Sequence, residues 1–274
     1  MTRHIEFINP FGTPIYDQII QETLLPYARP DSRVEVTHLT GCPANIDYYY
    51  PKHLMEVAIF DRVIAAEQRG CDAVIIGCCY DPGVLVAREL VDIPVVGPLE
   101  AALAMGRYFG HDFTVLTDHH KAVPYLRDMV RLYGYEPSCR AVRCINWWVT
   151  EMVKDPAAVA ADAVRIATEA MKRDESEVVI LGCTIIAGCL EQRVLAGEYR
   201  DVPIINPNLA ALKMAELLAD LRKMGKYSVS RRGYYEKQTQ HAAQATEFQE
   251  VRRRYRLVDL DLSSTGAGDD PPAR

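Results

Sequence analysis

Two cysteines at equivalent places of an internal repeat are the residues of this chain best suited to chemistry. Cys78 ends the segment DAVIIGC at 72–78, and Cys183 ends EVVILGC at 177–183. The repeat extends to a later pair of segments, 91–98 and 201–207, and to an earlier pair, 5–9 and 113–117. Two thiols that face each other across a cleft can take a proton from one face of a carbon and return one to the other face.

The elements that would position these thiols alternate between strands and helices, which predicts an α/β protein. We expect two pseudo-symmetric domains, each with a parallel sheet flanked by helices, and an active site in the cleft between them. The first half is expected to span 1–110 and to include a returning helix at 206–225, and the second half to span 111–205. The predicted strands are 5–9, 34–39, 73–77 and 95–96, then 113–117, 138–144, 178–182 and 203–205.

Residues 226–274 lie outside the repeat and form a C-terminal extension. The extension carries Arg231-Arg232 and Arg252-Arg253-Arg254, and 241–256 has the composition of a helix. Its last stretch, from Ser263, is rich in Ser, Gly, Asp and Pro, which predicts disorder. We expect a segment that packs on the body or on a partner subunit, with a lid over the site as the alternative.

The turn after Cys78 has the composition of a helix start. Asp81 is a good N-cap and Pro82 a good first helical residue, so a helix is expected over 82–91. A helix N-terminus lowers the pKa of a nearby thiol below its usual value of about 8.5, and its free N–H groups can hold a substrate oxygen. The second copy repeats this arrangement, with Thr184 as the candidate cap.

A cysteine after a buried strand is often only a small core residue, so the structural interpretation competes with the catalytic one. The matched pair favours catalysis, because two such cysteines occupy equivalent positions. Cys79 is the main competitor of Cys78, since consecutive strand residues point to opposite faces. The remaining cysteines have no matched partner and are expected to be structural: Cys42, Cys71, Cys139, Cys144 and Cys189.

Polar and aromatic residues at the other strand ends offer further candidates. Asn9 either donates to a substrate carbonyl or forms a turn. His119 and His120 either are solvated or capping residues, or orient a thiol or bind a carboxylate. A metal site is not expected there, because no carboxylate or further histidine lies at helical ligand spacing. Trp147-Trp148 are expected to pack over the cleft or at a subunit contact.

Composition excludes several other classes of protein. The chain has 274 residues and a formal net charge of −6, which argues against nucleic acid as a partner. No apolar run approaches the roughly 18 residues of a membrane span, and no secretory signal opens the chain. Neither a C-x-x-C pair nor a Gly-rich phosphate loop is present. We therefore expect a cytoplasmic homo-oligomer that acts on a small molecule without a cofactor, with no membrane or nucleic-acid partner.

At several of these positions the chain resembles the aspartate/glutamate/hydantoin racemase superfamily, and within it most closely the hydantoin and allantoin racemases. The resemblance covers about residues 5–220 and implies a cofactor-independent acid/base pair formed by two cysteines. In the family pattern, the spacing to Asp81 selects Cys78 over Cys79. The resembling stretches are Ile8-Asn9-Pro10, Cys78-x-x-Asp81-Pro82-Gly83, Pro94-Val95-Val96-Gly97, Val115-x-Thr117 and Leu181-Gly182-Cys183.

The chain departs from the family pattern where substrate is held, at 11–13, 118–120 and 184–186, and its loop at 46–50 has an extra tyrosine. The resemblance implies Cys78 and Cys183 as catalytic residues. The substrate-binding residues that we expect are Asn9, Phe11, Cys79, Tyr80, Asp81, Thr117, Asp118, His119 and Thr184.

The activity that the resemblance implies is racemisation at a carbon next to a carbonyl, with a 5-substituted hydantoin or a related ureide as the leading substrate class. Three alternatives come from the same superfamily: an amino-acid racemase, a maleate-type cis–trans isomerase and an arylmalonate-type decarboxylase. The decarboxylase needs only one cysteine, so the second one argues against it. An alternative of another class is a non-catalytic small-molecule binding protein, which retention of both cysteines disfavours.

Overall fold

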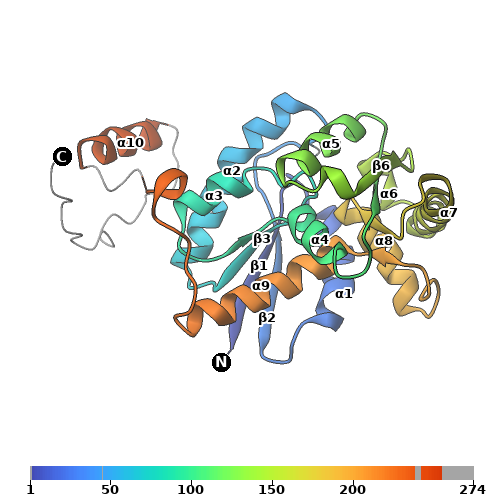
Figure 1. The fold of residues 1–274 in the computed structure, drawn as a ribbon. Helices are drawn as coiled ribbons and strands as arrows, with labels where there is room; N and C mark the ends of the chain where they lie inside the picture. Colours follow the sequence, from blue (N-terminus) through green and yellow to red (C-terminus); the bar gives the residue numbers. More distant parts are fainter. Residues whose placement is uncertain (1, 45, 238–241, 255–274) are drawn as a thin grey trace.

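The protein contains two four-stranded parallel sheets. Figure 1 shows the computed structural model, which describes residues 2–44, 46–237 and 242–254. The strand orders are β2-β1-β3-β4 and β6-β5-β7-β8, so each half repeats the same topology. The predicted α/β fold of two matched sheets is confirmed. The strands are β1 (Arg3–Asn9), β2 (Ser32–His38), β3 (Ala73–Ile76), β4 (Val95–Val96), β5 (Phe113–Thr117), β6 (Cys139–Cys144), β7 (Val178–Leu181) and β8 (Ile204–Ile205).

Helices cover both sheets, and their order in the chain follows the expected alternation. A 3₁₀ turn, Pro14–Tyr16, precedes α1 directly, and the Thr13 side chain accepts the backbone N–H of Ile15 at its start. One short helix, α6, was not predicted. The α-helices before the C-terminal extension are α1 (Asp17–Leu24), α2 (Tyr49–Gln68), α3 (Val84–Leu90), α4 (Pro98–Gly106), α5 (Ala122–Leu132), α6 (Val149–Met152), α7 (Pro156–Asp174), α8 (Thr184–Leu195) and α9 (Pro207–Lys223).

The central strands β3 and β7 are apolar on both faces, as is typical of parallel strands that helices cover on both sides. All four residues of β3 and all four of β7 are buried. In the first sheet β3 pairs with β1, with Ile8 opposite Ile76, and in the second β7 pairs with β5, with Leu116 opposite Leu181. Parallel pairing brings the carboxyl ends of these strands to one edge of each sheet. The residues that follow β3 and β7 therefore leave the sheets at matched places.

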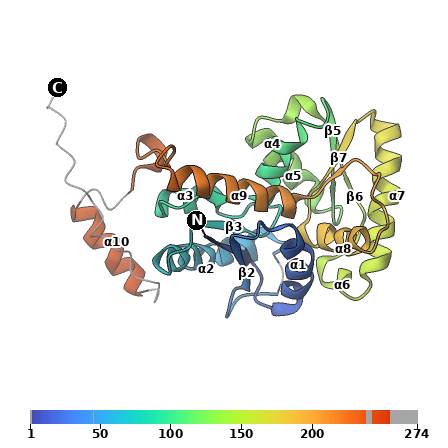
Figure 2. The same cartoon turned by 90° about the horizontal axis from the view of Figure 1, so that it is seen from below.

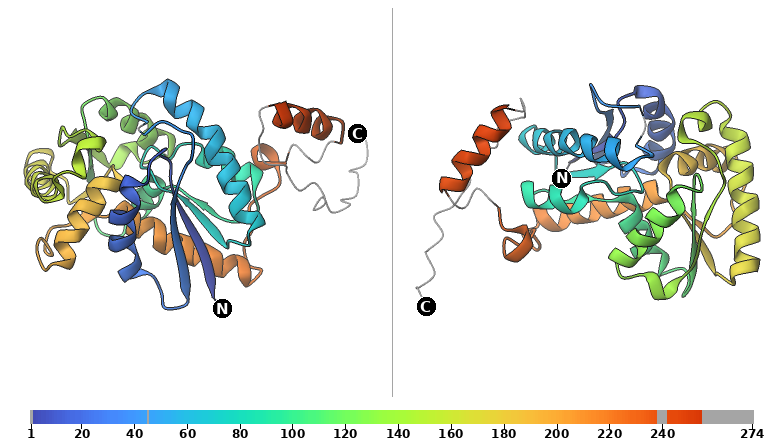
Figure 3. Two further views of the ribbon diagram at one scale, coloured as in Figure 1. Left: turned by 180° about the vertical axis from the view of Figure 1, so that it is seen from behind. Right: turned by 90° about the horizontal axis from the view of Figure 1, so that it is seen from above.

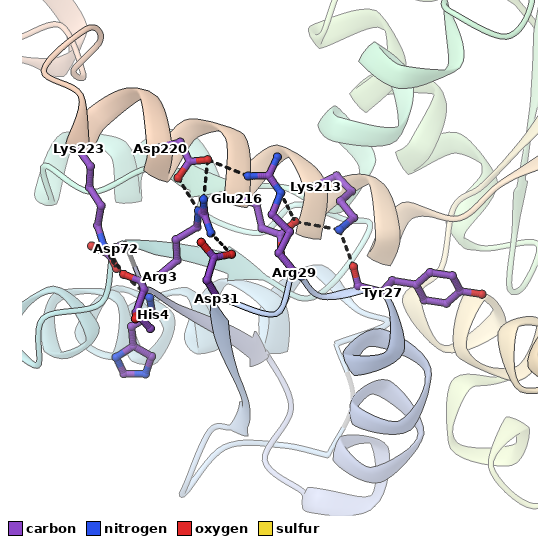
Figure 4. Close-up of polar contacts among 11 residues, drawn as sticks. Arg3, His4, Tyr27, Arg29, Asp31, Asp72, Lys213, Glu216, Asp220 and Lys223 are labelled. Carbon is purple, nitrogen blue, oxygen red and sulfur yellow. Dashed lines mark hydrogen bonds and ion pairs between the residues drawn. The ribbon is translucent and has the colours of Figure 1, made fainter.

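Helix α9 returns from the second half to pack against β1, β3 and α4, and Figure 2 shows it running along the first half. Figure 4 shows the polar contacts that hold it there. Arg3 of β1 donates to Asp220 of α9 over 2.8 Å, and Arg29 reaches the same carboxylate over 2.8 Å. Glu216, buried on α9, accepts the backbone N–H of Arg29 over 2.8 Å. These bonds fix α9 against the first sheet.

We expect Asp220→Asn to lower the free energy of unfolding by about 1–2 kcal/mol at pH 7, because the three hydrogen bonds that Arg3 and Arg29 donate to this carboxylate lose their negatively charged acceptor. The Arg3 guanidinium holds the pKa of Asp220 below its usual value, so the contribution is present above an ordinary aspartate pKa. It is lost as pH falls through the lowered pKa, and the gap between wild type and variant should then close. Denaturant unfolding at several pH values measures this, with exposed Asp201→Asn as control. A gap that does not depend on pH would contradict it.

The first part of the C-terminal extension is tied to the end of α3. Arg231 donates to the carbonyls of Arg88 over 3.0 Å and Glu89 over 3.1 Å, and pairs with Asp92 over 2.6 Å. A guanidinium is favourable there because the last carbonyls of a helix lack partners and carry partial negative charge.

The extension continues to a helix, α10 (Ala242–Arg254), as expected for 241–256. Figure 3 shows α10 at the end of the molecule opposite to α7, and Arg252 pairs with Asp61 of α2 over 2.8 Å. The disorder predicted from Ser263 onward lies outside the described residues. Among those residues no helix is both long and apolar enough to cross a membrane.

Candidate active site

Each of the two repeat cysteines follows a glycine that ends a buried central strand. A Cβ at Gly77 would lie 2.1 Å from the Phe7 ring, and one at Gly182 would lie 2.7 Å from Leu126. Only glycine fits at these two points, because the neighbouring side chains already fill the space. The repeated Gly-Cys therefore has a packing cause in both halves, and it carries both thiols past the strand ends at matched places.

Cys78 and Cys183 line the same cavity, which the two halves enclose between them. Its volume is about 20 Å³, room for about one water molecule. Both cysteines are buried, with 8 % and 7 % of their surface exposed. The structure thus brings the two cysteines that we predicted to be catalytic together at one small cavity. The full lining is Phe11, Ile46, Asp47, Cys78, Cys79, Tyr80, Asp118, Val149, Gly182, Cys183, Thr184 and Ile185.

The lining divides the expected substrate-binding residues into two groups. Phe11, Cys79, Tyr80, Asp118 and Thr184 border the cavity, whereas four other candidates do not: Asn9, Asp81, Thr117 and His119. Ile46, Asp47, Val149 and Ile185 border it without having been selected, although the departures from the family pattern at 46–50 and 184–186 had pointed to three of them.

Asp81 caps a different helix from the one expected. The N-cap of α3 is Gly83, and the Asp81 carboxylate instead accepts the backbone N–H groups of Leu99 and Glu100 at the start of α4, over 3.1 and 2.9 Å. The hydroxyl of Tyr133 also donates to it over 2.9 Å. The prediction of a cap on α3 is wrong because the chain turns through left-handed conformations at Asp81 and Gly83 before that helix begins. These hydrogen bonds of Asp81 fix the loop after Cys78 to the start of α4.

Burial sets the protonation of the Asp81 carboxyl. It raises the pKa of this group to about 7, against the lowering effect of the three hydrogen bonds that it accepts.

Cys79 and Thr184 occupy matched positions and join the two halves across the cavity. The Thr184 hydroxyl donates to the carbonyl of Gly77 over 3.2 Å, and the Cys79 thiol lies 3.9 Å from the carbonyl of Leu181. Thr184 does not cap α8, because Cys183 itself occupies the N-cap position. The two contacts link the segment after β3 to the segment after β7.

Asn9 and Thr117 end the matched strands β1 and β5 and do not border the cavity. The Asn9 amide donates to Asp17 over 2.6 Å, and Asp17 in turn contacts His38 over 2.7 Å. Thr117 donates to Asp118 over 2.9 Å. Asn9 therefore supports the first strand end through Asp17, and its contact with a substrate carbonyl stays a prediction.

His119 belongs to a buried acidic cluster beside the cavity. Its Nε2 lies 3.3 Å from Asp47 and 3.8 Å from Asp118, and its ring stacks on Trp148 with the centroids 4.2 Å apart. Burial lowers the pKa of His119, but the carboxylates of Asp47 and Asp118 outweigh this effect and raise it overall. Burial raises the pKa of Asp118 to about 6. His119 thus neutralises part of the negative charge near the thiols.

The two thiols have raised pKa values in this closed state, contrary to the lowering expected from helix N-termini. Burial is the main cause for both Cys78 and Cys183, and the negative charge of Asp118 adds to it. The N–H of Tyr80, 3.4 Å from the Cys78 sulfur, opposes the rise, as do the N–H groups at the start of α8 for Cys183. The expected lowering is wrong because desolvation of a buried thiolate outweighs these amides.

A metal ligand set is available in the acidic cluster. Asp47, Asp118 and His119 offer ligand atoms within 4.8 Å of one another, all of them buried. The sequence argument considered only helical spacing and so missed Asp47, which reaches the cluster from a distant loop. We still expect dialysis against a chelator to leave activity unchanged, because proton transfer between two thiols needs no Lewis acid. Loss of activity that zinc restores would assign these three residues as ligands.

Comparisons with known proteins agree with this geometry. The Asp/Glu/hydantoin racemase family model matches residues 5–215. A hydantoin racemase of Pseudomonas sp. (strain NS671) is 30 % identical over 219 residues, which cover 80 % of this chain and 87 % of the relative. Another, from Rhizobium meliloti, is 30 % identical over 215 residues, or 78 % of this chain and 88 % of that one.

Two solved structures of allantoin racemases are also similar to this chain. An allantoin racemase of Klebsiella pneumoniae superposes with a TM-score of 0.76 at 26 % identity, covering 86 % of this chain and 94 % of its own. One from Pseudomonas fluorescens superposes with a TM-score of 0.75 at 30 % identity, covering 85 % of this chain and 96 % of its own. The similarity therefore spans both halves and the cavity between them.

Proposed function

Because the chain belongs to the Asp/Glu/hydantoin racemase family, which it matches over most of its length, we propose that it racemises 5-substituted hydantoins or related ureides. The protein is an isomerase of the racemase type, and the proposal concerns its substrate and its reacting groups. The observation that best supports the proposed reaction is that Cys78 and Cys183, from matched places in the two halves, border one cavity. The relatives named for hydantoin and allantoin supply the substrate class.

In the proposed reaction the thiolate of one cysteine takes the hydrogen from ring carbon C5, which lies between a carbonyl and a nitrogen. The electron pair that remains is delocalised into the carbonyl as an enolate. The thiol of the other cysteine then delivers its proton to the opposite face, so the product has the opposite configuration and the second sulfur carries the charge. The N-terminal end of α8, which begins at Thr184, carries partial positive charge that favours negative charge on the enolate oxygen.

Substrate entry requires the closed cavity to open. A space of about 20 Å³ is too small for a hydantoin ring, so we propose that the contacts across the cleft separate when substrate binds. Those contacts are modest: the Thr184 hydroxyl to Gly77 over 3.2 Å and the Cys79 thiol to Leu181 over 3.9 Å. Closure over the bound ring then excludes water from the enolate.

Charge around the cavity favours a ureide over the alternatives from the same superfamily. Its charged lining residues are Asp47 and Asp118, and none of the residues that border it is Lys or Arg. An amino acid, a maleate or an arylmalonate would place a carboxylate beside the reacting carbon, where these two acids repel it. A neutral hydantoin ring carries no such charge. The negative charge of the lining therefore supports a neutral ureide over a substrate with a carboxylate at the reacting carbon.

The test is incubation of the enzyme in deuterated water with resolved 5-methylhydantoin, 5-isobutylhydantoin, allantoin, aspartate and glutamate. We expect loss of optical rotation and uptake of one deuterium at C5 for the hydantoins, above the enzyme-free rate, and neither change for the amino acids. Racemisation of the amino acids alone would overturn the proposal in favour of the amino-acid racemase. No exchange with any compound would favour a binding protein.

A further inference from the structure

A second, larger pocket adjoins the cavity of the two cysteines. Its volume is about 200 Å³, compared with about 20 Å³ for the cavity. Three residues, Ile46, Asp47 and Tyr80, border both spaces, so the two spaces are neighbours. A substituent on a ring held at the cysteines would extend into this outer pocket. Its other lining residues are Tyr48, Tyr49, Lys52, Lys121, Ala122, Pro124 and Tyr125.

Aromatic rings form one wall of the outer pocket. The Tyr80 and Tyr125 rings lie 4.8 Å apart between centroids, and Tyr49 meets Tyr125 edge-on at 6.0 Å. The Tyr125 hydroxyl donates to the backbone carbonyl of Tyr80 over 2.9 Å, which ties this wall to the loop after Cys78. Because these rings come from three separate segments, their arrangement depends on the whole fold, and they offer flat apolar faces to the methylene part of a bound group.

Two lysines border the outer pocket, and they differ in whether a carboxylate compensates their positive charge. Lys52 is buried and paired with Glu56 over 2.9 Å, so its charge is compensated. The ammonium of Lys121 instead donates to the backbone carbonyl of Asp47 over 2.9 Å and lies 4.2 Å from the centroid of the Tyr48 ring. Both partners are uncharged groups. The Asp47 carboxylate lies beside His119 at 3.3 Å, within the acidic cluster.

We propose that this outer pocket binds the 5-substituent of the substrate and selects one that ends in a carboxylate, which pairs with Lys121. This inference rests on the proposed function and adds to it a class of side chain, such as a carboxymethyl or carboxyethyl group on the hydantoin ring. The inner cavity repels a carboxylate at the reacting carbon, whereas the outer pocket accepts one a few bonds away. The tyrosine rings hold the intervening methylene groups.

The test compares hydantoin-5-acetic acid with hydantoin-5-acetamide, which has the same size and no charge. We expect kcat/KM for the acid to exceed that for the amide about tenfold, the effect of one partly solvated charge-assisted hydrogen bond. In Lys121→Gln, which keeps an N–H donor for the Asp47 carbonyl, the ratio should fall close to one. Lys121→Arg should retain it. The exposed Lys154→Gln, outside both pockets, should leave the ratio as in wild type.

The salt dependence of the acid-to-amide ratio of kcat/KM gives a second readout. Added salt screens a partly exposed ion pair, so it should lower this ratio. Equal rates for acid and amide in the wild-type enzyme, or an unchanged ratio in Lys121→Gln, would overturn this inference while the proposed function stands. A wild-type enzyme that exchanges neither compound, nor neutral 5-methylhydantoin, would overturn the proposed function and this inference with it.

Discussion

Cys78→Ser and Cys183→Ser are each expected to lower kcat for racemisation at least 10³-fold, because general acid–base catalysis contributes about 10²–10⁴-fold and a serine hydroxyl is a much weaker acid than a thiol. Both variants should remain folded, since serine is close to cysteine in volume and each position borders a cavity. Steady-state polarimetry with a neutral 5-substituted hydantoin measures the loss.

Cys139→Ser is the matched control for these two variants. Cys139 lies at the start of β6, away from the cavity, and its thiol faces the carbonyl of Ala141 at 3.4 Å, a contact that a hydroxyl can also make. Its rate should stay within about twofold of wild type, as for surface substitutions remote from a site. Racemisation at near wild-type rate by either cavity variant would rule out a mechanism that uses both thiols.

The rate should depend steeply on pH, rising about tenfold per unit between pH 6 and 8. Only an enzyme with one thiolate and one thiol is active, and the raised pKa values of Cys78 and Cys183 keep this form scarce at neutral pH. Raising the pH deprotonates a thiol, so activity increases until the second thiol also ionises and the rate falls. The pH profile of kcat/KM measures the thiols of the free enzyme.

Asp118→Asn tests the cause of this profile. Because the negative charge of Asp118 raises the pKa of both thiols, its removal should shift the rising limb to lower pH by about one unit. The exposed Asp128→Asn should not shift it. Iodoacetamide labelling of Cys78 and Cys183 should follow the same limb and be slowed by substrate. A rate that is flat from pH 6 to 8 would contradict the raised pKa values.

The paired strands and thiols could be predicted because their causes are local. The segments 72–78 and 177–183 each combine a buried strand, a glycine with no room for a side chain and a cysteine. The repeat then places the two cysteines at equivalent points, and parallel topology brings such points to one edge of each sheet. The two parallel sheets and the position of both cysteines at matched strand ends could therefore be predicted from the sequence. The domain boundary near Gly110 stays a prediction.

Other features around the thiols could not be predicted because long-range contacts determine them. Asp47 reaches His119 from a loop far away in the sequence, and Asp81 bonds to the start of α4 instead of α3. The raised pKa values of Cys78 and Cys183 could not be predicted for a related reason. A helix N-terminus can be read from neighbouring residues, whereas burial of Cys78 requires the opposite half of the molecule, including Cys183 and Thr184, to close over it.

The most direct test of the two-thiol account is hydrogen exchange at C5 of each resolved enantiomer in deuterated water, with the two single variants side by side. If each thiol serves one face, Cys78→Ser should still exchange one enantiomer, and Cys183→Ser should exchange only the opposite one. The wild-type enzyme should exchange both and interconvert them. Exchange of the same enantiomer by both variants, or of both enantiomers by either variant, would contradict the assignment of Cys78 and Cys183 to opposite faces.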